Sequence, residues 1–260
     1  MRKETGFEAV LTAFVDRYGL TRGDVLEVIM NTVARILSRW HDMEISVVYS
    51  EGRLVATGYS RIKGRFEDSN INLQSMRGWN SIKRMIENNM DQVVCLREAQ
   101  AYKNHEHTLR WGEIIKNDER ARKLTVEIVM DDGHALLAEC PYANIGAHER
   151  TKGVFEKLFA RGTRRAFHFR RINPVLLNGT PRLKVILDRQ SKCLPEALLR
   201  ERLISHRFGV SDLRLHCYRR IVGGVTFIRV NKSIPRDPII ETAFELSGER
   251  VKIEIDRKMV

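Results

Sequence analysis

Residues 109–115, LRWGEII, and residues 124–128, LTVEI, decide how this sequence folds, because they begin a series of short β-type segments. Charged or glycine-containing turns separate these segments, and such turns are expected between strands. Three further segments of the same kind follow at 135–138, 164–172 and 183–187. Five short strands within about 80 residues predict a small closed barrel.

Toward the amino terminus the pattern is helical. Apolar residues from Phe7 to Tyr18 recur at helical spacing and give one apolar stripe. Gly19 is expected to end that helix, and Thr21 with Asp24 three residues later is typical of a capping box that opens a second one. A second apolar stripe runs from Val25 to Leu37.

The β-rich runs 45–49 and 53–57 flank Ser50-Glu51-Gly52 and predict a hairpin. Residues 60–72 are polar and are expected to form turns, and 81–103 are expected to be helical. We therefore predict a compact α+β domain over residues 1–92 and a linker helix over 93–108.

Beyond the barrel segments the sequence alternates between helical and extended patterns. We predict helices at 195–205 and 238–247, and strands at 212–219, 225–231 and 250–255. Asp237 before Pro238 suits a helix start, because proline is tolerated in the first turn. Gly223-Gly224 is expected to form a turn between two strands, and Gly248 to end the last helix.

Charge is distributed unevenly along the 260 residues, whose net charge is +12. Residues 1–92 carry 13 basic and 12 acidic side chains, residues 93–192 carry 19 and 12, and residues 193–260 carry 13 and 9. The first third is nearly neutral, and the positive field belongs to the rest of the chain. This asymmetry favours a polyanion-binding part joined to a part with a different task, although a generally basic, soluble protein would also show it.

The most basic stretch is 150–171, with eight basic residues and one acid. Strand alternation places Phe167 and Phe169 on one face, where we expect them in the core rather than as base-stacking platforms. Arg164, His168 and Arg170 are then expected to share the outer face. Arginines beside a small barrel offer fixed donors to a phosphate backbone.

No catalytic pattern is present. The sequence has no phosphate-binding glycine loop, dinucleotide-binding motif, zinc-protease motif or hydrolase nucleophile elbow. His105 and His107 are interpreted as solvated linker residues rather than metal ligands, and the four cysteines form no CxxC pair. We expect a non-enzymatic protein with no cofactor and no metal. The lack of a long apolar run or signal-peptide core leads us to expect a cytoplasmic protein with no membrane partner.

Three collinear stretches resemble the bacterial transcription elongation and termination factor NusA family. The first is residues 97–99 with 109–115, similar to the family's linker helix and first S1 strand. The second is Phe159 to Thr163 together with 183–191, similar to later S1 strands, and the third is 237–253, similar to the end of the first KH domain. The helix junction Tyr18-Gly19-Leu20-Thr21 followed by a hairpin also fits the family's amino-terminal domain.

The sequence departs from the family at two points. No GxxG loop, with which a KH domain clamps nucleotides, is present, because Pro238-Ile239-Ile240-Glu241 leads directly into the last helix. Lys116-Asn117 also replaces the second S1 glycine.

The resemblance implies an α+β multidomain protein in four parts. These are an α/β polymerase-binding domain (1–92), a linker helix (93–108), an S1 or OB-type five-stranded barrel (109–190) and a truncated type II KH-like domain (191–260).

The resemblance further implies that residues 1–92 bind RNA polymerase near the RNA exit channel, with other transcription factors as further possible partners. The barrel and KH-like part would contact nascent RNA, mainly through its phosphates, and modulate pausing, termination or antitermination. The predicted RNA-binding residues are Arg161, Arg164, Arg165, Arg170, Arg171 and Lys184, followed by Arg214, Arg219 and Arg220.

Two other functions remain open at this point. One is a general S1-type RNA-binding protein that acts in translation or RNA decay. The other is an interaction protein that occupies the polymerase with little RNA contact, since the RNA motifs are eroded.

Overall fold

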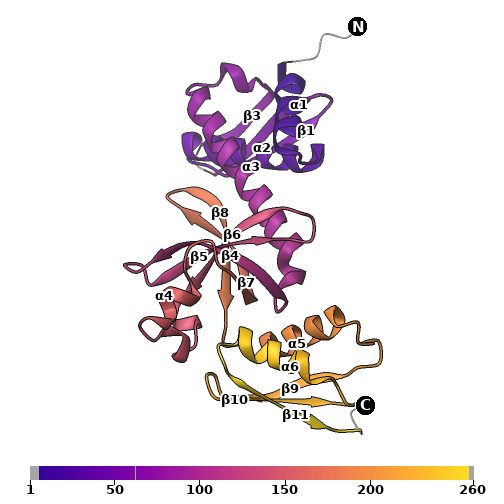
Figure 1. The fold of residues 1–260 in the computed structure, drawn as a ribbon. Coiled ribbons are helices and arrows are strands. Elements are labelled where there is room, and N and C mark those ends of the chain that lie inside the picture. The colour runs from indigo at the N-terminus through magenta and orange to yellow at the C-terminus, as the bar shows by residue number, and fades with distance from the viewer. Residues whose placement is uncertain (1–5, 62, 258–260) are drawn as a thin grey trace. The chain divides into compact units, whose positions relative to one another are not determined.

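The computed structural model describes residues 6–61 and 63–257, and the chain is of the mixed α+β class (Figure 1). It divides into two compact units. The amino-terminal unit comprises residues 1–99 with 174–182, and the carboxy-terminal unit comprises 100–173 with 183–260. Among the described residues, none of the helices has the length and apolar character that a membrane span requires.

The amino-terminal unit combines helices with a three-stranded sheet of order β1-β2-β3. Thr21 caps the second helix, and its side chain and that of Asp24 form the predicted capping box. Helix α2 packs on β1 and beside α1, and the core between them includes Val25, Ile29 and Leu54. The elements are α1 (Gly6–Tyr18), α2 (Arg22–His41), β1 (Ile45–Ser50), β2 (Arg53–Ser60), β3 (Gly64–Ile71), the short turn η1 (Leu73–Ser75) and α3 (Trp79–Tyr102), whose last residues belong to the other unit.

One prediction for this unit is wrong. Residues 64–71 form strand β3 rather than turns, and β3 pairs antiparallel with β2 at the edge of the sheet. Most of its side chains are exposed, and only Ile71 is fully buried. An edge strand that buries so few side chains carries no apolar alternation, so its composition resembles that of a loop.

The carboxy-terminal unit contains the predicted closed barrel, with strand order β4-β5-β6-β8-β7. β6 pairs parallel with β8, whereas β4 pairs antiparallel with both β5 and β7. Phe167 and Phe169 are fully buried in the barrel core, as predicted, together with Phe159 from the segment before β7. The elements are β4 (Leu109–Asp118), β5 (Lys123–Val129), β6 (Ala135–Pro141), α4 (Val154–Leu158), β7 (Arg164–Leu177) and β8 (Thr180–Asp188), with short turns η2 (Lys103–His105), η3 (Tyr142–Asn144) and η4 (His148–Arg150).

Two positions in the barrel depend on small or turn-forming residues. A Cβ at Gly112 would lie 2.4 Å from a methyl group of Val126, so β4 and β5 approach there too closely for a side chain. Asn178 and Gly179 both have positive φ and join β7 to β8 as a tight turn.

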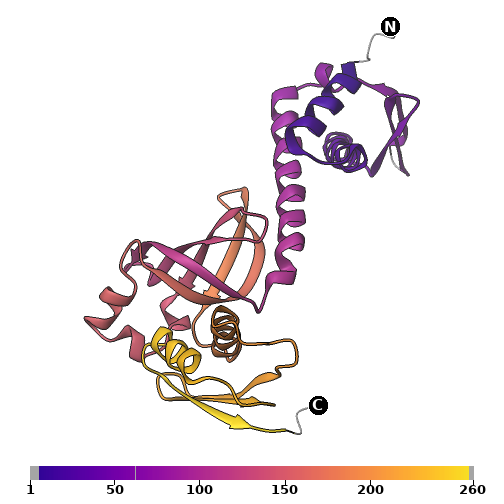
Figure 2. The same cartoon turned by 45° about the vertical axis from the view of Figure 1, so that its right-hand side comes forward.

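The last part of the carboxy-terminal unit, residues 191–257, is here named the carboxy-terminal lobe. Its sheet has the order β11-β10-β9, with β10 antiparallel to β9 and parallel to β11. Helices α5 and α6 cover one face of this sheet, and Leu199, Leu203 and Ile228 lie in the core between the layers (Figure 2). The elements are α5 (Cys193–Ser205), β9 (Leu215–Arg220), β10 (Val225–Val230), α6 (Arg236–Glu245) and β11 (Arg250–Ile255).

Candidate nucleic-acid interface

Three of the predicted RNA-binding arginines are exposed and unpaired. Arg161 lies in the loop before β7, Arg164 begins that strand, and Arg171 lies further along it. Within the described ranges, none of the three side chains makes an ion pair or hydrogen bond. Their guanidinium groups are therefore available to an anionic partner.

Arg170 and Lys184 are also exposed, and each has one weak contact. The Arg170 guanidinium donates to the Asn144 side-chain oxygen at 3.1 Å. The Lys184 ammonium lies 3.6 Å from Glu139, whose other oxygen contacts Lys123. Exposed contacts of this kind contribute little to stability, so both side chains can exchange them for a phosphate.

Two predicted arginines face the interior instead. Arg165 donates to the Leu158 carbonyl oxygen at 3.1 Å and lies 3.3 Å from Glu245. The Arg220 side chain is 3% exposed and forms a two-pronged ion pair with the fully buried Glu249, at 2.9 and 3.1 Å. A bound RNA strand could engage Arg220 only by breaking that pair.

The remaining two predicted residues lie on the carboxy-terminal lobe. Arg214 precedes β9 and is exposed. Arg219 is on β9, exposed, and its guanidinium carbon lies 5.9 Å from the ring centre of Phe227. Both lie in the lobe sheet region rather than on the barrel.

The prediction that His168 shares an outer face with Arg164 and Arg170 is wrong. His168 is 4% exposed, and its Nδ1 lies 2.9 Å from Asp188. The middle of β7 is buried on both faces, and the lobe places Leu194, Leu198 and Leu246 against Ala166. His168 is in contact with Asp188 at the end of β8 and with the ring of His107, whose centre is 5.5 Å away. Arg164 and Arg170 therefore lie at opposite ends of this covered segment.

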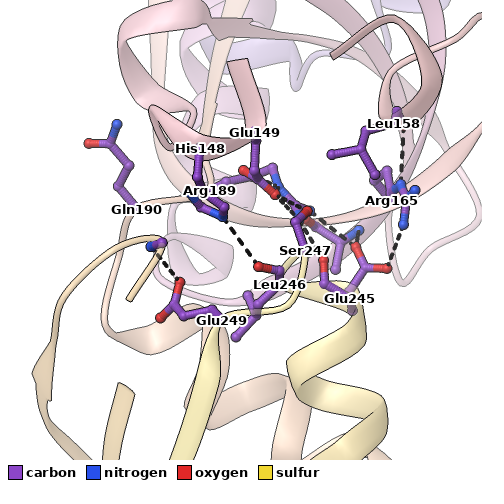
Figure 3. A network of polar contacts seen from close by, with 12 residues as sticks. His148, Glu149, Leu158, Arg165, Arg189, Gln190, Glu245, Leu246, Ser247 and Glu249 are labelled. Atoms are coloured by element: carbon purple, nitrogen blue, oxygen red, sulfur yellow. Dashed lines mark hydrogen bonds and ion pairs between the residues drawn. The ribbon is translucent and has the colours of Figure 1, made fainter. Parts of the chain in front are cut away.

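Sequence reasoning missed the residue that joins lobe to barrel. Arg189, just after β8, is 1% exposed and donates to Glu149 at 2.6 Å and to Glu245 at 3.1 Å (Figure 3). It also donates to the main-chain oxygens of Ala166 and Glu245, at 2.6 and 2.7 Å. Ser247 donates to Glu149 from the lobe side at 2.8 Å.

This buried cluster remains charged. Burial on its own lowers the pKa of Arg189, but the facing carboxylates Glu149 and Glu245 outweigh burial and the net pKa is raised. Burial likewise raises the pKa of Glu149, but Arg189 and Ser247 outweigh it and the net pKa is lowered. Charges taken out of water are tolerated only when their partners are in place, so the cluster fixes the lobe on the barrel.

A second contact set reinforces that junction. The Trp111 indole nitrogen on β4 lies 2.9 Å from both carboxylate oxygens of Glu201 on α5. Arg202 lies over the same indole ring at 5.3 Å. The lobe and the barrel thus share apolar, ionic and ring contacts inside one unit.

The turn between β4 and β5 carries two more free cations that sequence reasoning did not select. Arg120 and Arg122 are exposed, and neither makes an ion pair within the described part of the chain. Their signal in the sequence was the local run Arg120-Ala121-Arg122-Lys123 between two strand segments. Loops at this end of small barrels commonly meet oligonucleotides.

The amino-terminal unit has a hollow of about 720 Å³ between the end of α2 and the start of α3. Arg35, Arg39 and Arg77 line it, and none of the three is ion-paired in the described ranges. Trp40, which is 50% exposed, lies beside them, and none of the described lining residues is acidic. The hollow fits an acidic partner that also offers an apolar side chain.

Within the described residues, no group of three or more histidine, cysteine or acidic side chains is arranged to hold a metal ion. A scan against protein-family models matches none of them to this chain, and a search of curated proteins finds no match.

Proposed function

We propose that this chain is a NusA-like transcription factor without enzymatic activity. In this proposal the amino-terminal unit binds RNA polymerase near the RNA exit channel, and the carboxy-terminal unit contacts the emerging RNA. These contacts modulate pausing, termination or antitermination. The observation that carries the proposal is a closed five-stranded barrel with unpaired arginines around it, joined in the chain to a nearly neutral unit that presents a cationic hollow.

The barrel supports an S1 or OB-type interpretation. Numbered within the barrel, its strands follow the order 1-2-3-5-4, with the third and fifth strands parallel and a short helix before the fourth. Five-stranded barrels of the OB class bind single-stranded nucleic acids through one face and its adjoining loops. The exposed arginines at 120, 122, 161, 164 and 171 supply the cations that such binding requires.

The lobe supports a degenerate KH-like interpretation. Its order is helix, strand, strand, helix, strand, and the last two strands are parallel neighbours. Where the NusA family has two helices joined by GxxG, this lobe has α6 alone. Sequence-specific clamping of four nucleotides is therefore not part of the proposal.

The polymerase-binding half is tested with the hollow of the amino-terminal unit. Charge reversal of Arg39 together with Trp40→Ala removes a cation and the exposed ring, and we expect at least tenfold weaker binding of the full chain to bacterial core RNA polymerase. Tyr59→Ala is the matched control, because Tyr59 is 71% exposed in the same unit and does not line the hollow.

Three outcomes of that experiment separate the possible functions. If the unaltered chain binds polymerase and the hollow variant does not, the proposal is supported. If the unaltered chain binds RNA but not polymerase at moderate salt, a general RNA-binding role in translation or decay replaces the proposal. If it binds polymerase but not RNA, it acts by occupying the polymerase.

A further inference from the structure

The lobe sheet has an open face that the predicted sites do not include. Helices α5 and α6 lie on one side of β9, β10 and β11, and no described element lies across the other side (Figures 1 and 2). We name this other side the outer sheet face. It is defined by Tyr218 and Arg219 on β9, Phe227 and Arg229 on β10, and Lys252 on β11.

Two half-exposed aromatic rings lie side by side on the outer sheet face. The ring centres of Tyr218 and Phe227 are 5.9 Å apart and come from neighbouring strands. An irregularity in the β9–β10 register lies between Phe227 and Ile228, and both Tyr218 and Arg219 border Phe227. Both rings therefore lie outside the core that the sheet forms with α5 and α6.

Cations surround the rings. The Arg229 guanidinium carbon lies 4.4 Å from the Tyr218 ring centre. Two cations from the strands on either side of β10 lie near the Phe227 ring centre: the Lys252 ammonium at 5.7 Å and the Arg219 guanidinium carbon at 5.9 Å. The carboxylate of Glu254 lies beside them: it accepts from the Tyr218 hydroxyl at 2.5 Å and lies 3.7 Å from Arg229. The face as a whole is cationic and aromatic.

We propose that the outer sheet face binds single-stranded RNA, with bases stacked on Phe227 and Tyr218 and phosphates held by Arg219, Arg229 and Lys252. The two rings are tilted by 45° to each other, so each can stack with a separate unstacked base, whereas a duplex would present only its backbone to them. An acidic peptide would use the cations but would leave the rings without a role. The proposal rests on the proposed RNA-contacting function and gives it a second contact surface besides the barrel arginines.

This surface differs from the site that the resemblance implies. A KH domain holds nucleotides at its GxxG loop, on the side of the helices, and that loop is absent here. The outer sheet face lies on the opposite layer of the lobe. Loss of the clamp is thus compatible with RNA contact by the same lobe through stacking.

The experiment measures binding of a short fluorescent oligouridine to the full chain. Phe227→Ala is expected to weaken binding by about 5- to 100-fold, because each stacked base contributes on that scale. Phe227→Trp retains a stacking ring and should bind within about twofold of the unaltered chain. Phe244→Ala is the matched control, because Phe244 lies on α6 in the other layer and is 79% exposed.

A second measurement guards against a variant that fails to fold. Photo-crosslinking of a 4-thiouridine oligonucleotide to the unaltered chain should label the peptides that contain Tyr218 and Phe227. Equal binding by Phe227→Ala, Phe244→Ala and the unaltered chain, or crosslinks confined to the barrel, would overturn the proposal. The proposal would also be overturned if Arg219→Glu lost RNA binding while Phe227→Ala kept it. That result would indicate a purely ionic surface that also accepts acidic peptides.

The same variants keep this proposal distinct from the proposed function. Phe227→Ala should still bind core RNA polymerase as the unaltered chain does. If Phe227→Ala retains polymerase binding and its RNA binding is unchanged, the stacking proposal is refuted and the transcription role is not. If RNA binding depends on Phe227 but the chain does not bind polymerase, the transcription role is refuted and the stacking proposal is not.

Discussion

Two groups of arginines in the carboxy-terminal unit have the same chemistry and opposite tasks. Arg189 and Arg220 are buried, and each meets a carboxylate that is itself buried, Glu149 and Glu249 respectively. Arg164 and Arg171 are exposed and have no ionic partner among the described residues. A count of basic residues includes all four, but only the second pair can attract a polyanion, because buried carboxylates cancel the charges of Arg189 and Arg220.

The largest effect is expected at the centre of the buried group. Arg189→Met should destabilise the carboxy-terminal unit by about 3–5 kcal/mol, because Glu149 is left as a buried charge with only the Ser247 hydroxyl as partner. Glu245 loses one of its two arginine partners and keeps Arg165. Arg171→Met is the matched control and should change stability by less than about 0.5 kcal/mol. Hydrogen exchange of the full chain, followed on peptides from 164–172 and 240–248, measures the difference. Equal protection in both variants would refute the division into two groups.

Arg220→Met should destabilise the lobe by about 3 kcal/mol for the same reason, since Glu249 keeps only the Thr226 hydroxyl and the Gly223 amide as partners. Arg219→Met, one residue away and exposed, is the control. If Arg220→Met instead weakened RNA binding without any loss of stability, Arg220 would belong to the exposed group.

Lowering the pH should reduce the free energy of unfolding by protonating the buried carboxylates. The pKa of Glu149 is lowered in the folded chain, since Arg189 and Ser247 outweigh burial, and that of Asp188 is lowered because His168 and two main-chain amides outweigh burial. A lowered folded pKa gives stability that is complete above the unfolded value, about 4.3 for Glu, and is lost as pH falls through the folded value. Urea unfolding should show constant stability from pH 7 to about 5 and a decline below it. Rising stability on acidification would contradict the ion-pair assignment.

The exposed group should show the smallest effect on stability and a clear effect on binding. A triple variant carries Arg161→Glu, Arg164→Glu and Arg171→Glu. Its free energy of unfolding should lie within about 0.5 kcal/mol per substituted site of that of the unaltered chain. Its RNA affinity should fall, and the slope of log affinity against log salt should become shallower by about 0.7 for each lost phosphate contact on a single strand. An unchanged salt slope would exclude these arginines from the interface.

Sequence patterns predicted the elements that local chemistry controls. The Thr21 capping box and the buried Phe167 and Phe169 are present as predicted. Each depends on neighbours within a few residues or on strand alternation. Five barrel strands were likewise predictable because turn signals separate them.

Features that depend on distant segments were not predictable. Alternation predicts an exposed His168, but Asp188, 20 residues later in the chain, and the ring of His107 lie against it. Arg189 follows an apolar strand like any surface residue, and its partners are 40 and 56 residues away. The outer sheet face was missed because Tyr218 and Phe227 become neighbours only when β9 and β10 pair.

The most direct test of the proposed function uses a reconstituted bacterial elongation complex whose nascent RNA carries a photoreactive base just outside the polymerase. We expect the full chain to bind this complex and to crosslink to the RNA through residues 161–171 or 215–230. Arg39→Glu together with Trp40→Ala should weaken both binding and crosslinking on the complex at least tenfold while free RNA is still bound. A chain that does not join the complex, or that joins it without contacting the RNA, would contradict the proposed function.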